Sequence, residues 1–178
     1  LAAFEAWRIG PAAPDAGWGR LIAAEGNAES GLMVLVDMPE REDAASGRLL
    51  TGEAGRLFDR MLAAIGRDRQ SIYLAALAAA RPIAGQIAAE DVAPLAALSR
   101  QHIALVKPKR LLMLGNAVSR ALLGANAAPT SANLHVLKYD GGQTEAVASF
   151  HPRFLLQQPA RKAEAWRDLQ VLIGGMDA

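Results

Sequence analysis

The stretch Met33-Val34-Leu35-Val36-Asp37-Met38-Pro39 decides the class of fold. Four apolar residues in a row are followed by an acidic residue and, two positions later, a proline. This pattern is typical of a short buried strand that ends in a loop. Two further runs, Ser71 to Leu77 and Arg110 to Leu114, are predicted to be strands of the same sheet. We expect the first and the last of these three runs to be neighbouring strands.

Helices are predicted between these strands. Thr51 is the expected N-cap of the first one, in which apolar residues recur at three- and four-residue spacing until Gly66. A longer helix is expected from about Ala88 to Val106, and a closing helix from near Pro159. Strands that alternate with helices argue for a mostly parallel sheet that is covered on both faces.

The sequence therefore predicts an α/β fold, a three-layer αβα sandwich with a central four-stranded, mostly parallel sheet. Its strands should begin near Met33, Ser71, Arg110 and Glu145. Leu134 to Lys138 is expected to form a further strand that turns back on the last one. The segment from Ala125 to Asn133 is expected to be a loop.

Length and composition limit the classes of protein to consider. With 178 residues, of which 52% are hydrophobic, the chain can form a single domain, residues 1–178, with a sizeable core. It has no cysteine, which excludes disulfides, zinc–thiolate sites and cysteine-ligated iron–sulphur clusters. The three histidines fall on separate predicted elements, so we expect no metal and no cofactor.

Hydropathy and charge bear on location and partners. No apolar stretch reaches the roughly 20 residues that a membrane span requires, so a cytoplasmic protein without a membrane partner is expected. The formal net charge of +1 neither favours nor excludes binding to nucleic acid. A DNA-binding face would need a local cluster of basic side chains to neutralise phosphates. The first residue is Leu rather than Met, which leaves open whether the natural chain begins further upstream.

Two polar residues stand at the carboxyl ends of predicted strands, where parallel α/β sheets bind ligands. Asp37 is either an acid that activates water or a turn residue that caps the local backbone. His151 is either a hydrogen-bond donor to a ligand or a structural histidine. Glu42 and Asp43, in the charged loop beyond the first strand, are expected to face solvent.

Several segments, in order, resemble the family 4 branch of the uracil-DNA glycosylase superfamily, whose members carry an iron–sulphur cluster. They are Glu25-Gly26-Asn27 (E-G-N), Gly47 to Gly55 (G-R-P-F-V-G-x-A-G), Tyr73 to Ala75 with Arg81-Pro82, Lys107 to Gly115 (R-P-K…A-L-G), Ala121 to Gly124, and His151-Pro152-Arg153-Phe154-Leu155-Leu156 (H-P-A-x-L-L). The resemblance runs from about Glu25 to Leu172. It implies the glycosylase fold, DNA as the partner, and base excision in DNA repair by hydrolysis of an N-glycosidic bond.

The resemblance also assigns roles to residues. The candidate catalytic residues are Asp37 and His151, and the base pocket would contain Met38, Pro39, Leu50 and Ala76. The candidate DNA-binding residues are Arg48, Asn116 and Arg153. Arg48 either contacts a phosphate or ties its own loop down by an internal hydrogen bond.

Departures from the family are as informative as the matches. The family motif G-E-x-P-G reads Val36-Asp37-Met38-Pro39-Glu40 here, so that only the proline is kept and a carboxylate replaces the last glycine. The aromatic residue that stacks on uracil corresponds to Leu50, and the asparagine that reads the base edge corresponds to Ala76. Two cluster cysteines fall at Ala80 and Leu95, where we expect apolar packing to replace the brace that the cluster provides.

Three functional hypotheses follow. The first is a catalytically weak or inert relative that binds DNA or a nucleobase through an eroded base-recognition site. The second is an active base-excision glycosylase with altered base specificity that uses Asp37 and His151. The third is a scaffold or interaction domain in which the old pocket is filled by apolar side chains.

Overall fold

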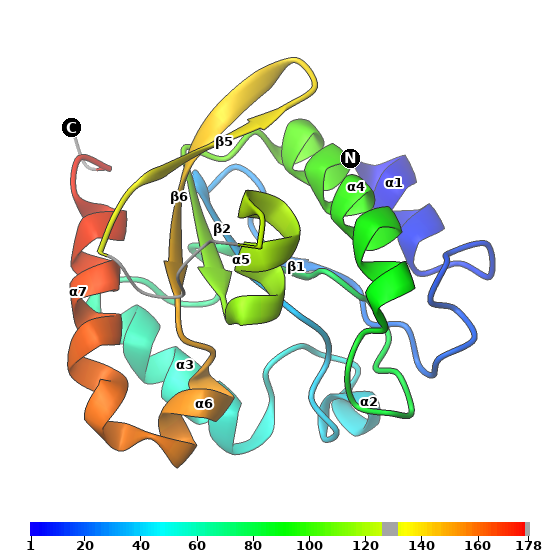
Figure 1. Ribbon diagram of the computed structural model, residues 1–178, viewed down its shortest axis with the longest axis horizontal. Helices are drawn as coiled ribbons and strands as arrows, with labels where there is room; N and C mark the ends of the chain where they lie inside the picture. Colours follow the sequence, from blue (N-terminus) through cyan, green and yellow to red (C-terminus); the bar gives the residue numbers. More distant parts are fainter. Residues whose placement is uncertain (126–131, 177–178) are drawn as a thin grey trace.

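The computed structural model describes residues 1–125 and 132–176, so that most of the predicted loop from Ala125 to Asn133 lies outside the described residues. Its sheet has six strands in the order β1-β3-β2-β4-β6-β5 (Figure 1). The strands are β1 (Glu25–Gly26), β2 (Leu32–Val36), β3 (Tyr73–Ala76), β4 (Arg110–Leu114), β5 (His135–Tyr139) and β6 (Gly142–Ser149). The helices are α1 (Ala2–Arg8), α2 (Asp43–Ser46), α3 (Gly52–Ala64), α4 (Ala89–Val106), α5 (Asn116–Leu123), α6 (Pro152–Gln157), a 3₁₀ turn (Pro159–Arg161) and α7 (Lys162–Ile173).

The predicted α/β sandwich is confirmed, with a correction to the number of strands. β2 pairs in parallel with both β3 and β4, and β4 pairs in parallel with β6. The runs that begin near Met33 and Arg110 are therefore neighbours, as predicted. The sheet has six strands rather than four because β1 and β5 add an antiparallel strand at each edge. β1 was missed because two residues carry no strand periodicity.

Helices cover both faces of the sheet (Figure 1). On one face, Val34 of β2 belongs to the same buried cluster as Phe58 of α3 and Leu172 of α7. On the other face, Leu35 of β2 belongs to a cluster that includes Ile103 of α4 and residues of α5. Successive residues of β2 thus point to opposite faces and both are buried, which explains its unbroken apolar run.

A buried ion pair ties the N-terminal segment to the end of β3. Arg8 of α1 pairs with Asp15, whose side chain is fully buried and also accepts the backbone amide of Ala79 at 2.6 Å. Arg8 donates to the carbonyl oxygen of Leu77 at 3.2 Å. Leu95 does pack in an apolar cluster with Leu77. Both an apolar cluster and a buried ion pair therefore stabilise this region, where only apolar packing was expected.

Among residues 1–125 and 132–176, no helix combines the length and the apolar character that a bilayer crossing requires.

Candidate functional site

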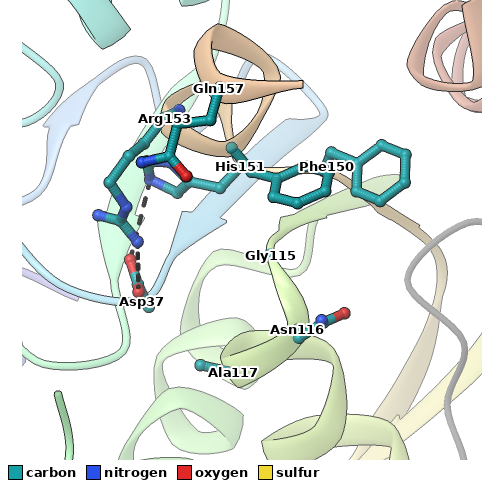
Figure 2. Close-up of a pocket in the computed structure, with 9 residues that line it drawn as sticks. Asp37, Gly115, Asn116, Ala117, Phe150, His151, Arg153 and Gln157 are labelled. Atoms are coloured by element: carbon teal, nitrogen blue, oxygen red, sulfur yellow. Dashed lines mark hydrogen bonds and ion pairs between the residues drawn. The ribbon is translucent and has the colours of Figure 1, made fainter. Parts of the chain in front are cut away.

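A cavity of about 290 Å³ lies where β2, β4 and β6 end, at the edge of the sheet where the sequence placed the candidate site. It is lined by Asp37, Gly115, Asn116, Ala117, Phe150, His151, Arg153, Phe154 and Gln157 (Figure 2). Gly115 has a φ of 101°, and a Cβ at this position would lie 3.4 Å from the Cβ of His151. The positive φ favours glycine at this position, whereas a Cβ would make only an ordinary van der Waals contact with the histidine.

His151 is held by the start of α6. It is the N-cap residue of that helix, and its Nδ1 accepts the backbone amide of Arg153 at 3.0 Å. Because Nδ1 is an acceptor, the neutral ring carries its proton on Nε2. That atom is buried and has no hydrogen-bond partner among the described residues. The nearest carboxylate oxygens are Oε1 of Glu40 at 3.6 Å and Oδ1 of Asp37 at 3.8 Å.

Burial controls the charge of His151. Desolvation lowers the pKa of this histidine to about 4, and Asp37 opposes that shift without cancelling it. The imidazole is therefore neutral near pH 7. A neutral ring with an unpaired Nε2–H can donate one hydrogen bond to a ligand without bringing a charge.

We expect the pKa of His151 in the folded protein to be about 4, compared with about 6.5 in the unfolded chain. The unfolded state then binds a proton that the folded state does not between these two values. Stability should fall as the pH drops from about 6.5 to about 4, by on the order of 3 kcal/mol. NMR titration of the ring gives the pKa, and urea unfolding of wild type and His151→Gln at pH 7 and pH 4.5 isolates its share. Equal pH dependence in both proteins would contradict the prediction.

Arg153 crosses from α6 to the end of β2. Its Nη2 donates to Oδ2 of Asp37 at 3.1 Å, and its Nη1 donates to Oε1 of Glu40 (Figure 2 shows the contact with Asp37). Both carboxylate side chains are about 10% exposed. Burial raises the pKa of Glu40, while the charge of Arg153 opposes that shift. The arginine thus holds two mostly buried carboxylates in one cluster beside His151.

Asp37 binds the local backbone, as the turn-residue interpretation of the sequence expects, and it also faces the cavity. Its Oδ1 accepts the backbone amide of Met38 at 2.9 Å, which is the cap of a turn. The same side chain lines the cavity and forms the ion pair with Arg153. Its carboxylate is therefore occupied by partners within the protein.

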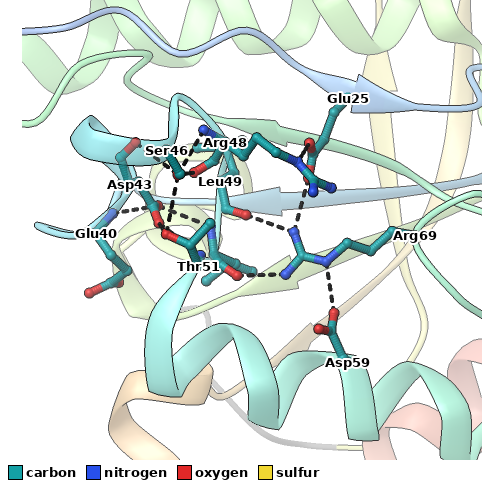
Figure 3. A network of polar contacts seen from close by, with 10 residues as sticks. Glu25, Glu40, Asp43, Ser46, Arg48, Leu49, Thr51, Asp59 and Arg69 are labelled. Atoms are coloured by element: carbon teal, nitrogen blue, oxygen red, sulfur yellow. Dashed lines mark hydrogen bonds and ion pairs between the residues drawn. The ribbon is translucent and has the colours of Figure 1, made fainter.

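The loop between β2 and α3 is organised by Asp43, which was expected to face solvent and is instead fully buried. Its carboxylate accepts the amides of Glu40, Leu50 and Thr51 at 2.8–2.9 Å and the Thr51 hydroxyl at 2.5 Å (Figure 3). Charged loops are usually solvated, but a carboxylate that accepts this many donors is stable when buried. Asp43 thereby fixes the backbone that carries Glu40 into the site.

Arginines secure the other side of this loop. Arg69 donates to the carbonyl oxygens of Leu49 and Leu50, at 2.7 and 2.5 Å, and pairs with Glu25 and Asp59 (Figure 3). Arg48 pairs with Glu25 at 2.8 Å, and its side chain is 57% exposed. The internal hydrogen bond foreseen for Arg48 is therefore present, although the exposed guanidinium also remains accessible.

The structure brings together only some of the candidate residues. Asp37, Asn116, His151 and Arg153 line one cavity. Met38, Pro39, Leu50 and Ala76 are not in its lining. Leu50 is 1% exposed and packs in the cluster beneath α3, and Ala76 is half-buried against the same cluster.

The role of Glu40 was not foreseen, because the sequence marked it only as a replaced glycine. Arg153 was expected to contact DNA, and the structure places it in an ion pair with Glu40. Both positions depart from the motifs that the chain resembles, and the new residues have opposite charges. An acidic residue replaces the family residue in one motif and a basic residue replaces it in the other. Because both motifs lie at the same site, these two replacements together would have predicted the ion pair.

Comparison with known proteins places the chain in a family. Residues 23–170 match the family model described as the uracil DNA glycosylase superfamily. The chain therefore belongs to that superfamily. It is similar to the type-4 uracil-DNA glycosylase of Pyrobaculum aerophilum, with 26% identity over 86% of this chain and 82% of the relative. The type-4 enzymes of Thermotoga maritima (24% identity, 77% and 72%) and Archaeoglobus fulgidus (20%, 84% and 78%) are also similar.

The iron–sulphur cluster that the family 4 resemblance implies does not fit this chain. Such clusters are held by cysteine thiolates, and the chain has no cysteine. Ala80 and Leu95, at two of the expected ligand positions, are buried and cannot coordinate iron. Within the described ranges, no group of three or more histidine or carboxylate side chains is placed to hold a metal ion.

Proposed function

We propose that this protein is a DNA-binding member of the uracil-DNA glycosylase superfamily that excises uracil weakly or not at all. The observation that carries the proposal is the ion-pair cluster of Arg153 with Asp37 and Glu40. A carboxylate that activates water must be free to accept its proton. Asp37 is instead bound to a guanidinium in the space that a flipped nucleotide would enter.

A second reason to expect weak excision is that the side chains that would bind the base are missing. Reading a base edge requires a hydrogen-bonding side chain, and stacking requires a π-face. Ala76 has no hydrogen-bonding atom in its side chain, and Leu50 has no ring and lies in the core. Removing a polar partner from such a site costs several powers of ten in discrimination.

One observation favours the second hypothesis, an active glycosylase with altered base specificity. The unpaired Nε2–H of His151 is a neutral donor beside a cavity that remains open. A donor in that position is suited to stabilise negative charge that develops on a departing base. Activity on another base would then require Arg153 to move away from Asp37. The open cavity counts against the third hypothesis, a scaffold with a filled pocket.

Binding and excision assays separate these hypotheses. Fluorescein-labelled single-stranded and duplex DNA containing uracil is titrated with protein, and the same samples are tested for alkali-labile abasic sites. We expect binding that weakens with salt and no strand cleavage after alkali. Turnover on uracil or another base that His151→Ala abolishes would replace the proposal with the second hypothesis. Absence of both binding and turnover would reject both.

A further inference from the structure

A second hollow lies next to the candidate site. It has a volume of about 300 Å³ and is lined by Arg20, Arg41 and Arg81, together with Pro39, Glu40, Ala44 and the segment from Pro82 to Ile83. We call it the arginine groove. Glu40 lines this groove, whereas its partner Arg153 lines the first cavity. The Arg153–Glu40 pair therefore lies between the two hollows.

Two of the three arginines are held in place by backbone carbonyls. Nη1 of Arg20 donates to the carbonyl oxygen of Ala44 at 2.6 Å, and Nη1 of Arg81 donates to that of Pro39 at 3.1 Å. A guanidinium carries five N–H donors, so each side chain keeps donors beyond those used here. Arg41 is exposed and forms no hydrogen bond or ion pair with any residue that the structure describes.

The charge of the groove is positive. Glu40 is the one acidic residue in its described lining, and its charge is matched by Arg153 from the neighbouring cavity. The described lining therefore carries three guanidinium groups and one carboxylate. Planar arginine forks that are already positioned bind phosphate oxygens with two parallel hydrogen bonds, at little further cost in side-chain entropy.

An apolar side chain stands at the rim of the same groove. Ile83 is 99% exposed, in a turn closed by a hydrogen bond from the Gly85 amide to the Pro82 carbonyl oxygen at 2.9 Å. In Figure 1, this segment before α4 lies beside α2. An exposed aliphatic side chain next to a phosphate site can contact a base or sugar of the same strand. A free phosphate ion has no base or sugar with which Ile83 can make such a contact.

From this placement we infer that the arginine groove binds a phosphodiester of a nucleic-acid strand, with Ile83 in contact with an adjacent nucleoside. This inference rests on the proposed function, because it gives the path of the DNA beside the candidate site. The strand would enter past Arg41 and pass the Arg153–Glu40 pair. The groove would then supply affinity that does not depend on the base bound in the first cavity.

Arg41 is the residue to change, because it has no described partner within the protein and its removal should leave the fold intact. We expect Arg41→Ala to weaken binding of a labelled single-stranded oligonucleotide several-fold, and Arg41→Glu to weaken it further. The slope of log K against log salt should fall in magnitude by about 0.7 for each phosphate that the variant no longer neutralises. Arg167→Ala is the matched control, since Arg167 is exposed on α7 outside the lining of the groove.

A second pair of measurements separates a strand from a free phosphate group. NMR signals of the Arg20 and Arg81 Nε–H groups are followed during titration with inorganic phosphate and with the oligonucleotide. Ile83→Ala should weaken oligonucleotide binding and leave phosphate binding unchanged. If the oligonucleotide binds wild type but Arg41 variants match Arg167→Ala, the groove is not the path and the inference fails while the proposed function stands. If only inorganic phosphate shifts the arginine signals while the oligonucleotide still binds wild type, the inference fails and the proposed function stands; if the oligonucleotide does not bind wild type at all, both fail.

Discussion

Wild-type protein should excise uracil from DNA at least about four orders of magnitude more slowly than the type-4 enzyme of Thermotoga maritima assayed beside it. Three features of the site combine to give this expectation. The side chain of Ala76 has no hydrogen-bonding atom, and Asp37 is paired with Arg153. Glu40 adds a carboxylate at the end of β2 that helps to hold Arg153 beside Asp37. Single-turnover cleavage of a uracil-containing oligonucleotide measures the rate.

The control for this prediction is His151→Ala. If the residual excision by wild type takes place at this site, His151→Ala should excise uracil more slowly than wild type. A wild-type rate within about tenfold of the type-4 enzyme would mean that other residues supply the readout, and that the Arg153 ion pairs open readily. An equal residual rate in both proteins would show that the site makes no contribution.

Asp43→Ala is expected to lower the free energy of unfolding by about 3–5 kcal/mol. Its carboxylate accepts the backbone amides of Glu40, Leu50 and Thr51 and the Thr51 hydroxyl, in a fully buried position. Each buried donor left without a partner costs about 1–3 kcal/mol, and the costs add only in part because the donors share one acceptor. Urea denaturation monitored by tryptophan fluorescence measures the change.

Asp59→Ala is the matched control for the Asp43 prediction. Asp59 belongs to the same polar network through Arg69, but its side chain is 54% exposed. Its removal should cost no more than about 1 kcal/mol. Asp43→Asn should be intermediate, because it keeps one acceptor oxygen. A decrease below about 1 kcal/mol for Asp43→Ala would show that water replaces the carboxylate and that the loop does not depend on it.

The sequence predicted the sheet well because buried parallel strands leave a strong pattern. The apolar run that ends at Asp37 and the run from Arg110 to Leu114 are long enough, and bounded clearly enough, to be recognised singly. The edge strand β1 has two residues and shows no such pattern. The short helix α6 begins at Pro152, directly after His151, and its six residues are too few to show helical periodicity.

The candidate site was predicted less completely, because its geometry depends on pairs of residues far apart in the chain. Asp37 and His151 could be placed at strand ends from the sequence alone. The contact of Arg153 with Glu40 spans 113 residues, and it can be predicted only when the departures of both residues from their motifs are considered together. Asp43 looked like a solvated charge because its hydrogen-bond partners are mostly backbone amides, which leave no trace in the sequence.

The Arg8–Asp15 pair shows the same limit at the N-terminal segment. The absence of cysteine led us to expect that apolar packing at Ala80 and Leu95 replaces the brace that the cluster provides. The structure adds a fully buried carboxylate that binds an arginine and the backbone at Ala79 and Ala80. A buried ion pair of this kind is visible only once both partners are placed, because each residue type alone is common on protein surfaces.

The central claim is that the ion pairs of Arg153 with Asp37 and Glu40, together with the missing base-reading side chain at Ala76, silence a site in which Asp37 and His151 are still present. The most direct test is alkali-labile cleavage of a uracil-containing oligonucleotide by wild type and by the combined variant Glu40→Gly, Arg153→Ala, Ala76→Asn. Leu50 is left unchanged, because a ring in the packed core would cost about 1–3 kcal/mol. The account predicts very slow cleavage by wild type, and cleavage by the variant that is about 10²-fold faster and is abolished by adding His151→Ala. Robust cleavage by wild type, or a variant that binds the oligonucleotide yet stays silent, would contradict it.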